Sequence, residues 1–489
     1  MSPRRAPQVN PVLVLVVVAL VPALALFAAW RWADGHAEGA APPPTTSLAP
    51  PPPAPQLTTP LLSFRRAPGV LSRDVNLDAF RAAVEEFAAT IEPPSCVAVS
   101  VDGVPVASVR ADVPLIPASN QKVLVAAVAL EVLGEDYTYT TEVRATAAPT
   151  GGVLAGDVYL VGGGDPLLTS STYPTQHDPN PVTSPTSLDA LADAIVQAGV
   201  RRIEGRIVGD GSRYDDEFYA PSWVNDIRGI EAGPFDALLV NDARVTGDSL
   251  RASDPNVAAA RELAQLLAAR DVVVTGEPTS GTTPEEATTV LGSVTSAPMS
   301  AVVGEMLSTS DNNTAEMIVK ELGVAAGGGG TREAGLEVMR RTLAGWGLPM
   351  DGVVLDDGSG LSNENRVTCQ LLVGVLARHR PTDALGAGLA VAGESGTLRE
   401  VFTDSPVAGR LRAKTGTLGN APFNADPPAV KSLSGYLPVD GGSAVEFALV
   451  LNAAGTLTDQ SVYRPIWDRL ARTLATYPSG PTPAELAPR

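Results

Sequence analysis

An uncharged, strongly apolar run from Pro11 to Trp30 stands near the start of the chain, just after Arg4 and Arg5. In a helix that rises 1.5 Å per residue, about 20 residues cover the roughly 30 Å hydrocarbon core of a bilayer. We therefore expect residues 11–30 to form a transmembrane anchor, with residues 1–10 as a short cytoplasmic tail. A cleaved signal peptide is the alternative, although its apolar core is usually about 7–15 residues long.

Residues 31–62 do not continue the apolar run and form a linker, because the stretch from Pro42 to Pro60 is rich in proline. Such a composition gives a semi-rigid polyproline spacer rather than a packed domain. The spacer would hold the rest of the chain outside the cytoplasm, tethered to the membrane at the cell envelope. If the apolar run were cleaved instead, the same part of the chain would be secreted.

The remaining chain shows helical or alternating apolar spacing at both of its ends. Residues 96–101 and 104–109 read as two strands joined at Asp102-Gly103, a dipeptide typical of β-hairpins. Apolar positions also predict strands over 411–417, 432–437 and 444–451, and helices over 77–91, 314–322, 331–343 and 462–474. Strands at both ends with helices between them favour an α/β (α+β) fold, an antiparallel sheet flanked by helices and built from residues 63–145 and 290–478.

The long middle of the chain carries strand and turn signals of its own. Strands are expected over 156–161, 203–208 and 272–274. We assign residues 146–289 to one or two inserted, mainly β domains, and residues 479–489 to a disordered C-terminal tail.

Composition narrows the function classes. The formal net charge is −19 over 489 residues, whereas a nucleic-acid partner or an anionic membrane surface calls for a basic footprint. The three histidines, His36, His177 and His379, are too scattered to support a Ser-His-Asp triad or a histidine zinc site. We therefore expect no metal, no cofactor and no nucleic acid.

The candidate chemistry lies in three short motifs, in the order Ser119-Asn120-Gln121-Lys122, Ser310-Asp311-Asn312 and Lys414-Thr415-Gly416-Thr417. The first opens an apolar segment that ends at Gly134, so Ser119 reads as the N-cap of a helix. The third lies in a predicted strand. Serine needs a base as it attacks, and Lys122 is one helical turn from Ser119.

A lysine acts as a base only when its pKa is lowered, and we expect burial and repulsion from Lys414 to do this for Lys122. Ser310 can relay protons, and Asn312 can orient Lys122 and bind a substrate amide. Backbone N–H groups of Ser119 and Thr417 can meet a developing oxyanion.

The third motif also offers a substrate site along the strand edge formed by Thr415, Gly416 and Thr417. Because Gly416 has no side chain, it would leave room along this edge for the substrate backbone to pair with the strand. Lys414 and the Thr417 hydroxyl would bind a substrate carboxylate, which predicts selectivity for a C-terminal acid.

Two cysteines, Cys96 and Cys369, complete the candidate residues. In an oxidising compartment they can form one disulfide, and two buried free thiols are the equal alternative.

The three motifs resemble those of penicillin-binding proteins and class A β-lactamases. Further segments resemble the D-alanyl-D-alanine carboxypeptidase/endopeptidase family, the class C low-molecular-mass penicillin-binding proteins or peptidase family S13. These segments are Gly162-Gly163-Gly164-Asp165-Pro166, Asp210-Gly211-Ser212-Arg213-Tyr214-Asp215, Leu239-Val240-Asn241-Asp242-Ala243, Asp357-Gly358-Ser359-Gly360-Leu361-Ser362 and Gly396-Thr397-Leu398-Arg399.

This resemblance implies a penicillin-binding, serine β-lactamase-like transpeptidase domain in which Ser119 is acylated and Lys122 is the base. Ser310 and Asn312 would form the second element, and Lys414 with Thr417 the third. The implied activity is a serine DD-peptidase that releases D-Ala from peptidoglycan stem peptides, can cleave DD cross-links, and is blocked covalently by β-lactams. A β-lactamase and a non-catalytic β-lactam-sensing or scaffold protein are the alternatives.

Overall fold

The computed structural model describes residues 20, 21, 23–32, 67–173, 182–419, 428–453 and 457–487. The chain falls into two units, residues 1–67 and 68–489. In the first unit, residues 20–32 apart from 22 are helical. No described helix has both the length and the apolarity that a membrane crossing needs. Residues 11–19 and 22 of the predicted anchor, the predicted tail over 1–10 and residues 33–62 of the predicted linker lie outside the described residues.

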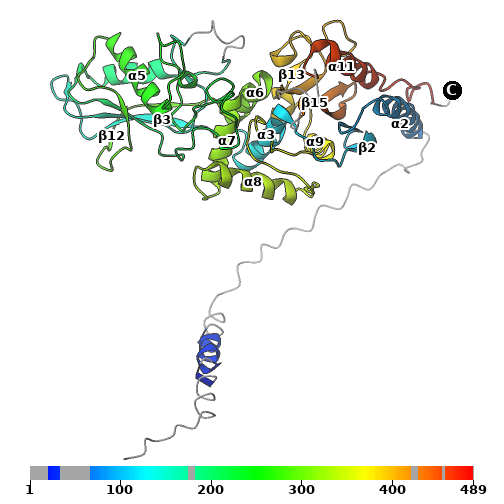
Figure 1. Ribbon diagram of the computed structural model, residues 1–489, viewed down its shortest axis with the longest axis horizontal. Coiled ribbons are helices and arrows are strands. Elements are labelled where there is room, and N and C mark those ends of the chain that lie inside the picture. The colour runs from blue at the N-terminus through cyan, green and yellow to red at the C-terminus, as the bar shows by residue number, and fades with distance from the viewer. Residues whose placement is uncertain are drawn as a thin grey trace, which may run out of the picture. The chain divides into compact units, whose positions relative to one another are not determined.

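A six-stranded antiparallel sheet organises the second unit (Figure 1). Its order is β13 (Ala390–Val391), β14 (Arg412–Leu418), β15 (Ala429–Val439), β16 (Ser443–Ala453), β1 (Cys96–Val101) and β2 (Val104–Val109). Strands from the two ends of the unit are neighbours, since Cys96 pairs with Val450 and Val101 with Val445. The predicted hairpin is confirmed, because Asp102 and Gly103 both adopt positive φ between β1 and β2.

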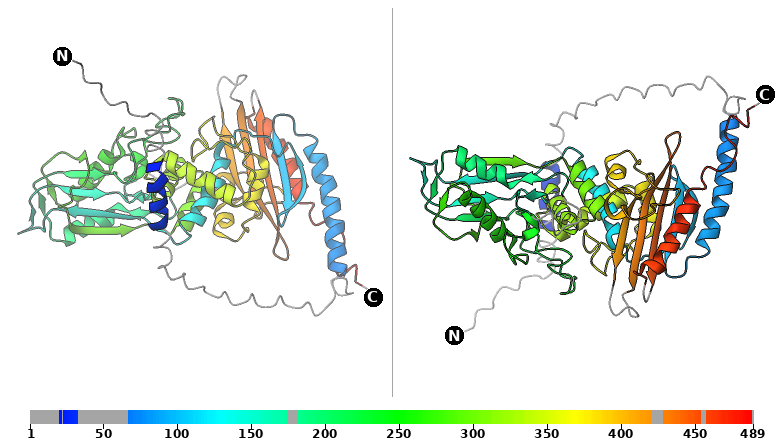
Figure 2. Two further views of the ribbon diagram at one scale, coloured as in Figure 1. Left: turned by 90° about the horizontal axis from the view of Figure 1, so that it is seen from below. Right: turned by 90° about the horizontal axis from the view of Figure 1, so that it is seen from above.

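Both faces of this sheet are buried, which explains why β1 is apolar at five of its six positions. In β1, Val97, Val99 and Val101 pack with α2 (Ala67–Ala88) and α11 (Gln460–Leu474). Cys96 and Ala98 point the other way, toward α3 (Gln121–Val132) and α9 (Cys369–Leu376). Figure 2 shows the sheet between these two helical layers. The antiparallel sheet with flanking helices confirms the expected fold class.

Helix α3 lies at the centre of its layer, and every residue from Gln121 to Leu130 is buried. Around it pack α6 (Met299–Thr309), α7 (Asn312–Ala325), α8 (Arg332–Gly345) and α10 (Ala384–Gly388). The helices predicted over 314–322 and 331–343 are thus confirmed as α7 and α8.

The predicted N-cap at Ser119 is wrong. A 3₁₀ turn, η1 (Ala118–Asn120), precedes α3, and no side chain caps either helix. The Ser119 hydroxyl is instead engaged by the Lys122 ammonium.

The middle of the chain builds a five-stranded sheet of its own. Its order is β11 (Thr279–Ser280), β9 (Ile207–Asp210), β5 (Val158–Val161), β3 (Thr140–Ala145) and β12 (Thr289–Thr295). A second, three-stranded sheet holds β10 (Val273–Val274), β8 (Arg202–Ile203) and β4 (Val153–Leu154), and β6 (Leu168–Thr169) pairs with β7 (Thr186–Ser187). Helices α4 (Leu188–Gln197) and α5 (Pro255–Ala268) pack on this core. The domain bounds themselves stay predictions.

The single strand expected over 203–208 is wrong, because the structure divides it between β8 and β9. Gly205 lies at the break, where a Cβ atom would come within 2.3 Å of the Gly156 backbone. The backbones at Gly156 and Gly205 lie so close together that no side chain fits at position 205, and the strand is interrupted there. Near the C-terminus, Gly480 N donates to Asn76 and the Pro481 carbonyl accepts from Ser72, so residues of the predicted tail contact α2.

Candidate active site

The three motifs, which are far apart in the sequence, meet beside the sheet edge at β14. The Lys122 Nζ atom lies 3.1 Å from Ser119 Oγ and 2.7 Å from Asn312 Oδ1. The Lys414 Nζ atom lies 2.8 Å from Ser310 Oγ. The motif side chains therefore form two hydrogen-bonded sets, Ser119–Lys122–Asn312 and Ser310–Lys414, and the charge of Lys122 is felt at Lys414.

The turn that presents Ser119 is held by two glycines from distant segments. Ala118, just before the serine, adopts a φ of +49°, which residues with a side chain rarely do. A Cβ on Gly360 would come within 2.0 Å of the Ala118 carbonyl, and one on Gly416 within 3.0 Å of the Pro117 carbonyl. Gly416 is therefore needed for the close approach of β14 to the turn, and not only to clear the substrate edge as the sequence predicted.

Lys122 is fully buried and has three hydrogen-bond acceptors, because the Ser359 carbonyl lies 2.6 Å from Nζ in addition to Ser119 and Asn312. Burial lowers the pKa of Lys122 to about 8, against the opposing charges of Asp357, Asp311 and Glu316. An appreciable fraction of the neutral amine is then present near neutral pH, as a general base requires.

Lys414 is also fully buried, and its Nζ donates to the Thr415 carbonyl (2.7 Å) as well as to Ser310 Oγ. Burial, and then repulsion by Lys122, hold the pKa of Lys414 well below its ordinary value. Burial is thus the leading cause of the lowered pKa for both lysines. Repulsion by Lys122 adds to it for Lys414, whereas the expected effect of Lys414 on the pKa of Lys122 is not seen.

Sequence reasoning missed the acidic group that holds the 357–362 loop against Lys122. The Glu316 carboxylate, from α7, accepts the N–H groups of Gly358 (3.1 Å) and Ser359 (2.7 Å). Asp357 accepts from Gly360 N, Ser362 N, Asn365 Nδ2 and Trp223 Nε1 at 2.6–2.8 Å. The Asp357 segment was visible as a family signature, but nothing in the sequence marked Glu316.

The middle segment of the chain reaches this site at Glu231. Asn312 Nδ2 donates to the Glu231 carbonyl at 2.8 Å, while its Oδ1 accepts from Lys122. Asn312 is thereby fixed in one orientation, and one of its two N–H bonds is already used. Its neighbour Asp311 caps α7 at Thr314 N, and burial raises the pKa of Asp311 to about 6.

The outer edge of β14 is open. β13 pairs only with Arg412 and Ala413. From Lys414 to Leu418 no described strand pairs with β14 on this side. An extended peptide can add to such an edge through its main chain.

The two threonine hydroxyls on this edge have different partners. Thr415 Oγ1 donates at 2.8 Å to Oγ1 of Thr397, which lies in the 3₁₀ turn η3 (Gly396–Leu398). Thr417 Oγ1 accepts from Lys431 Nζ at 2.7 Å. The sequence predicted Thr417, and Thr397 belongs to one of the segments that carry the family resemblance, but nothing in the sequence marked Lys431.

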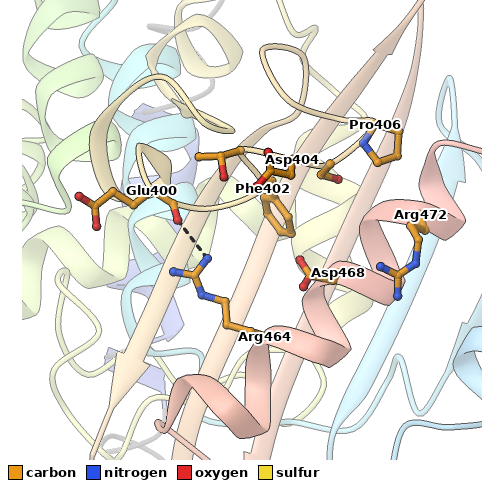
Figure 3. A pocket seen from close by; sticks show the side chains of 9 residues that line it. Glu400, Phe402, Asp404, Pro406, Arg464, Asp468 and Arg472 are labelled. Carbon is orange, nitrogen blue, oxygen red and sulfur yellow. Dashed lines mark hydrogen bonds between the residues drawn. The ribbon is translucent and has the colours of Figure 1, made fainter.

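Cys96 and Cys369 are joined by a disulfide, which links β1 to the start of α9 across 273 positions. No group of three or more His, Cys, Asp or Glu side chains in the described part of the chain is arranged to hold a metal ion. A hollow of about 290 Å³ lies beside α11, lined by Phe402, Asp468 and Arg472 among others (Figure 3), and it includes no residue of the three motifs.

Comparison with known proteins adds an independent finding. The family model described as "D-Ala-D-Ala carboxypeptidase 3 (S13) family" matches residues 93–252 and 239–477. The chain is 30% identical over 438 residues to a D-alanyl-D-alanine carboxypeptidase of Actinomadura sp. (strain R39), which covers 73% of this chain and 77% of that protein. It is 32% identical over 361 residues to carboxypeptidase DacB of Mycolicibacterium smegmatis, with 71% and 73% covered. Among solved structures, penicillin binding protein 4 of Haemophilus influenzae shares the fold, with a TM-score of 0.65 at 19% identity over 81% of this chain and 99% of that one.

Proposed function

The chain belongs to the D-Ala-D-Ala carboxypeptidase 3 (S13) family, and we propose that it releases the terminal D-Ala of peptidoglycan stem peptides through an acyl-enzyme on Ser119. The observation that carries this assignment is the contact of Ser119 Oγ with the buried, pKa-lowered amine of Lys122 at 3.1 Å. A serine becomes an efficient nucleophile only beside such a base.

Acylation begins with a peptide lying along the open edge of β14. The neutral Lys122 amine removes the proton of Ser119 Oγ while this oxygen attacks the carbonyl carbon between the two D-Ala residues. The backbone N–H groups of Ser119 and Thr417 are the proposed donors to the oxyanion. The proton then passes through Ser310 to the leaving nitrogen, the C–N bond breaks, and free D-Ala departs.

Deacylation repeats the same steps with water as the nucleophile. Lys122 removes a proton from water while the water oxygen attacks the ester carbon. The bond from this carbon to Ser119 Oγ then breaks, the proton returns to Oγ, and the shortened peptide leaves with a new carboxylate. A DD cross-link differs only in the amine that leaves, so endopeptidase action needs no further residue. β-Lactams would acylate Ser119 in the same way, because the ring amide takes the place of the peptide bond.

The test compares the full chain with Ser119→Ala and with Ser249→Ala, a control at an exposed serine in the middle segment. Each protein is incubated with a stem pentapeptide and with a cross-linked muropeptide, and products are identified by mass. A labelled penicillin measures the covalent adduct. We expect D-Ala release and a long-lived adduct in wild type and Ser249→Ala, and neither in Ser119→Ala.

The same data separate the alternatives. Release of D-Ala and adduct formation by Ser119→Ala would refute the assignment of the nucleophile. Rapid turnover of penicillin by the wild type would indicate a β-lactamase, and a stable adduct without any D-Ala release would indicate a sensing or scaffold protein.

We also propose that the protein works outside the cytoplasm, anchored by residues 11–30 and spaced from the membrane by residues 31–62. The support is the apolar run and the proline-rich stretch in the sequence. Fractionation of cells followed by mass analysis of the N-terminus tests this. Recovery from the medium of a chain that begins after the apolar run would establish cleavage instead.

A further inference from the structure

Lys431 lies in β15 directly opposite Thr417, the last residue of the third motif. Its Nζ atom reaches the Thr417 hydroxyl at 2.7 Å. Only 8% of the residue is exposed, although lysine is among the residue types least often buried. A buried ammonium placed against the substrate edge needs an explanation.

Aromatic rings of α11 hold this ammonium in place. Nζ lies 4.1 Å from the ring centre of Tyr463 and 5.7 Å from that of Trp467, and the two rings meet edge to face. Such contacts stabilise a cation and fix its direction. They supply no negative charge, however, and no carboxylate among the described residues forms an ion pair with Lys431.

The other cation nearby, Arg464 of α11, has acceptors of its own. It donates to the Glu400 carbonyl, as Figure 3 shows, and its Nε atom donates to the Tyr463 hydroxyl at 3.3 Å. Its charge contributes to lowering the pKa of Lys431, to about 8, after the larger effect of burial. Lys431 is therefore mainly charged near neutral pH and has no anionic partner in the described structure.

Hydrogen-bond direction shows what this charge does to Thr417. An ammonium has only donors, so the Thr417 oxygen must accept from Lys431. The hydroxyl proton of Thr417 is then left to donate elsewhere, along the open edge of β14. Thr415 is less suited to this task, because its hydroxyl already donates to Thr397.

Lys414 is also poorly placed to supply the charge for a substrate carboxylate. Its Nζ is tied to Ser310 Oγ and to the Thr415 carbonyl, and burial and Lys122 hold its pKa well below the ordinary value. The contact with Ser310 Oγ and the lowered pKa suit Lys414 to proton transfer more than to anion binding.

We propose that Lys431 is the positioning residue for the C-terminal carboxylate of the substrate, acting through Thr417, whose hydroxyl it orients as a donor while its ammonium supplies the positive charge. This inference rests on the proposed function and deepens it, since it assigns carboxylate recognition to a residue outside the three motifs. The rings of Tyr463 and Trp467 hold the ammonium beside Thr417, at the edge of β14 where the substrate would bind.

The test uses the full chain and measures the preference for a free carboxylate. One readout is the ratio of kcat/KM for a diacetylated L-Lys-D-Ala-D-Ala peptide to that for its C-terminal amide. A second is the ratio of acylation rates by benzylpenicillin and by its methyl ester. Lys431→Met removes the charge at nearly constant length, and Lys431→Arg keeps it. As a control, Arg472→Met removes a charge from α11, the helix that covers Lys431.

Loss of a charge-assisted contact should lower both ratios about tenfold in Lys431→Met, mainly through KM. Lys431→Arg and Arg472→Met should stay within about twofold of wild type, a change too small to represent a lost charged contact. Thr417→Val should match Lys431→Met, and the double variant should lose little more, because both remove one shared interaction.

Unchanged ratios in a Lys431→Met protein that still binds labelled penicillin would overturn the inference and leave Lys431 as a packing residue for α11. Should that variant fail to fold, an unchanged ratio in Thr417→Val overturns it equally. Failure of the proposed function would be seen separately, as a wild type that neither releases D-Ala nor forms an adduct.

Discussion

Replacement of Glu316 by glutamine should make the protein more stable and less active at pH 8. The Glu316 carboxylate is 1% exposed and accepts the N–H groups of Gly358 and Ser359. Through this loop it fixes the Ser359 carbonyl, which lies 2.6 Å from Lys122 Nζ. Glutamine keeps the shape and one acceptor oxygen but carries no charge.

The magnitude follows from the pKa of Glu316, which burial and then repulsion by Asp357 raise from 4.5 to about 7. Because the folded state binds the proton more tightly, the contribution of Glu316 to stability is fully present below pH 4.5 and is lost as the pH rises through 7. At 1.36 kcal/mol per unit, the ionised form above pH 7 disfavours folding by about 3 kcal/mol. Loss of one hydrogen bond offsets about 1 kcal/mol of the gain, so the variant should be about 2 kcal/mol more stable at pH 8.

Activity should change in the opposite direction. A loosened Ser359 carbonyl no longer holds Lys122 in line with Ser119, and misplacement by about 1 Å costs about 100-fold in rate. The negative charge of Glu316 also supports the ammonium form of Lys122. Without that charge, the inflection of acylation rate against pH should move below 8.

The assay combines urea unfolding at pH 5 and pH 8 with penicillin acylation from pH 6 to 9. Glu337→Gln, at a half-exposed glutamate on α8, serves as the control and should change neither measurement. If Glu316→Gln differed from wild type by the same free energy of unfolding at both pH values, Glu316 would not titrate near 7 and the reasoning would fail.

Three further results are expected. The wild-type acylation rate by penicillin should rise from pH 6, pass its half-maximum near pH 8 and level off above that pH, since neutral Lys122 amine accumulates as the pH rises through its lowered pKa; a flat profile would exclude this base. Gly416→Ala should lower that rate at least about 100-fold in the labelling assay, because the new Cβ would lie 2.2 Å from Ser432 Oγ, and an unchanged rate would contradict the tight approach of β14. Replacing Cys96 and Cys369 by alanine should lower the free energy of unfolding by about 2–5 kcal/mol in a urea titration, and a loss below about 1 kcal/mol would contradict the constraint expected from a closed loop of 273 positions.

The parts that could be predicted from the sequence are those encoded locally. Asp102-Gly103 gives the β1–β2 hairpin, because both residues tolerate positive φ. Apolar spacing gives α7 and α8. The three short motifs indicate a penicillin-binding or β-lactamase-like site, and five further segments indicate the S13 family. Each of these signals lies within one stretch of chain, so no tertiary contact is needed to read it.

What could not be predicted depends on segments that meet only in the fold. In the sequence Glu316 looks like any glutamate of a helix, and its role comes from hydrogen bonds to the Gly358 and Ser359 backbone that exist only in the folded protein. Lys431 stands just before the strand predicted over 432–437, and its role depends on two rings of α11 that contact it only in the folded protein. The positive φ of Ala118 has no local cause either, because it depends on the close approach of Gly360 and Gly416.

The pairing of β1 with β16 sets the order in which the molecule can become active. Contacts between residues so far apart in sequence are slow to form, and a chain is made from its N-terminus. While β14, β15 and β16 are still missing, Ser119 and Lys122 exist without Lys414 or a substrate edge, and β1 presents an unpaired strand edge of the kind that invites aggregation. The last strands of the unit thus complete both the sheet and the chemistry, so a chain truncated before β14 would carry the nucleophile and remain inert.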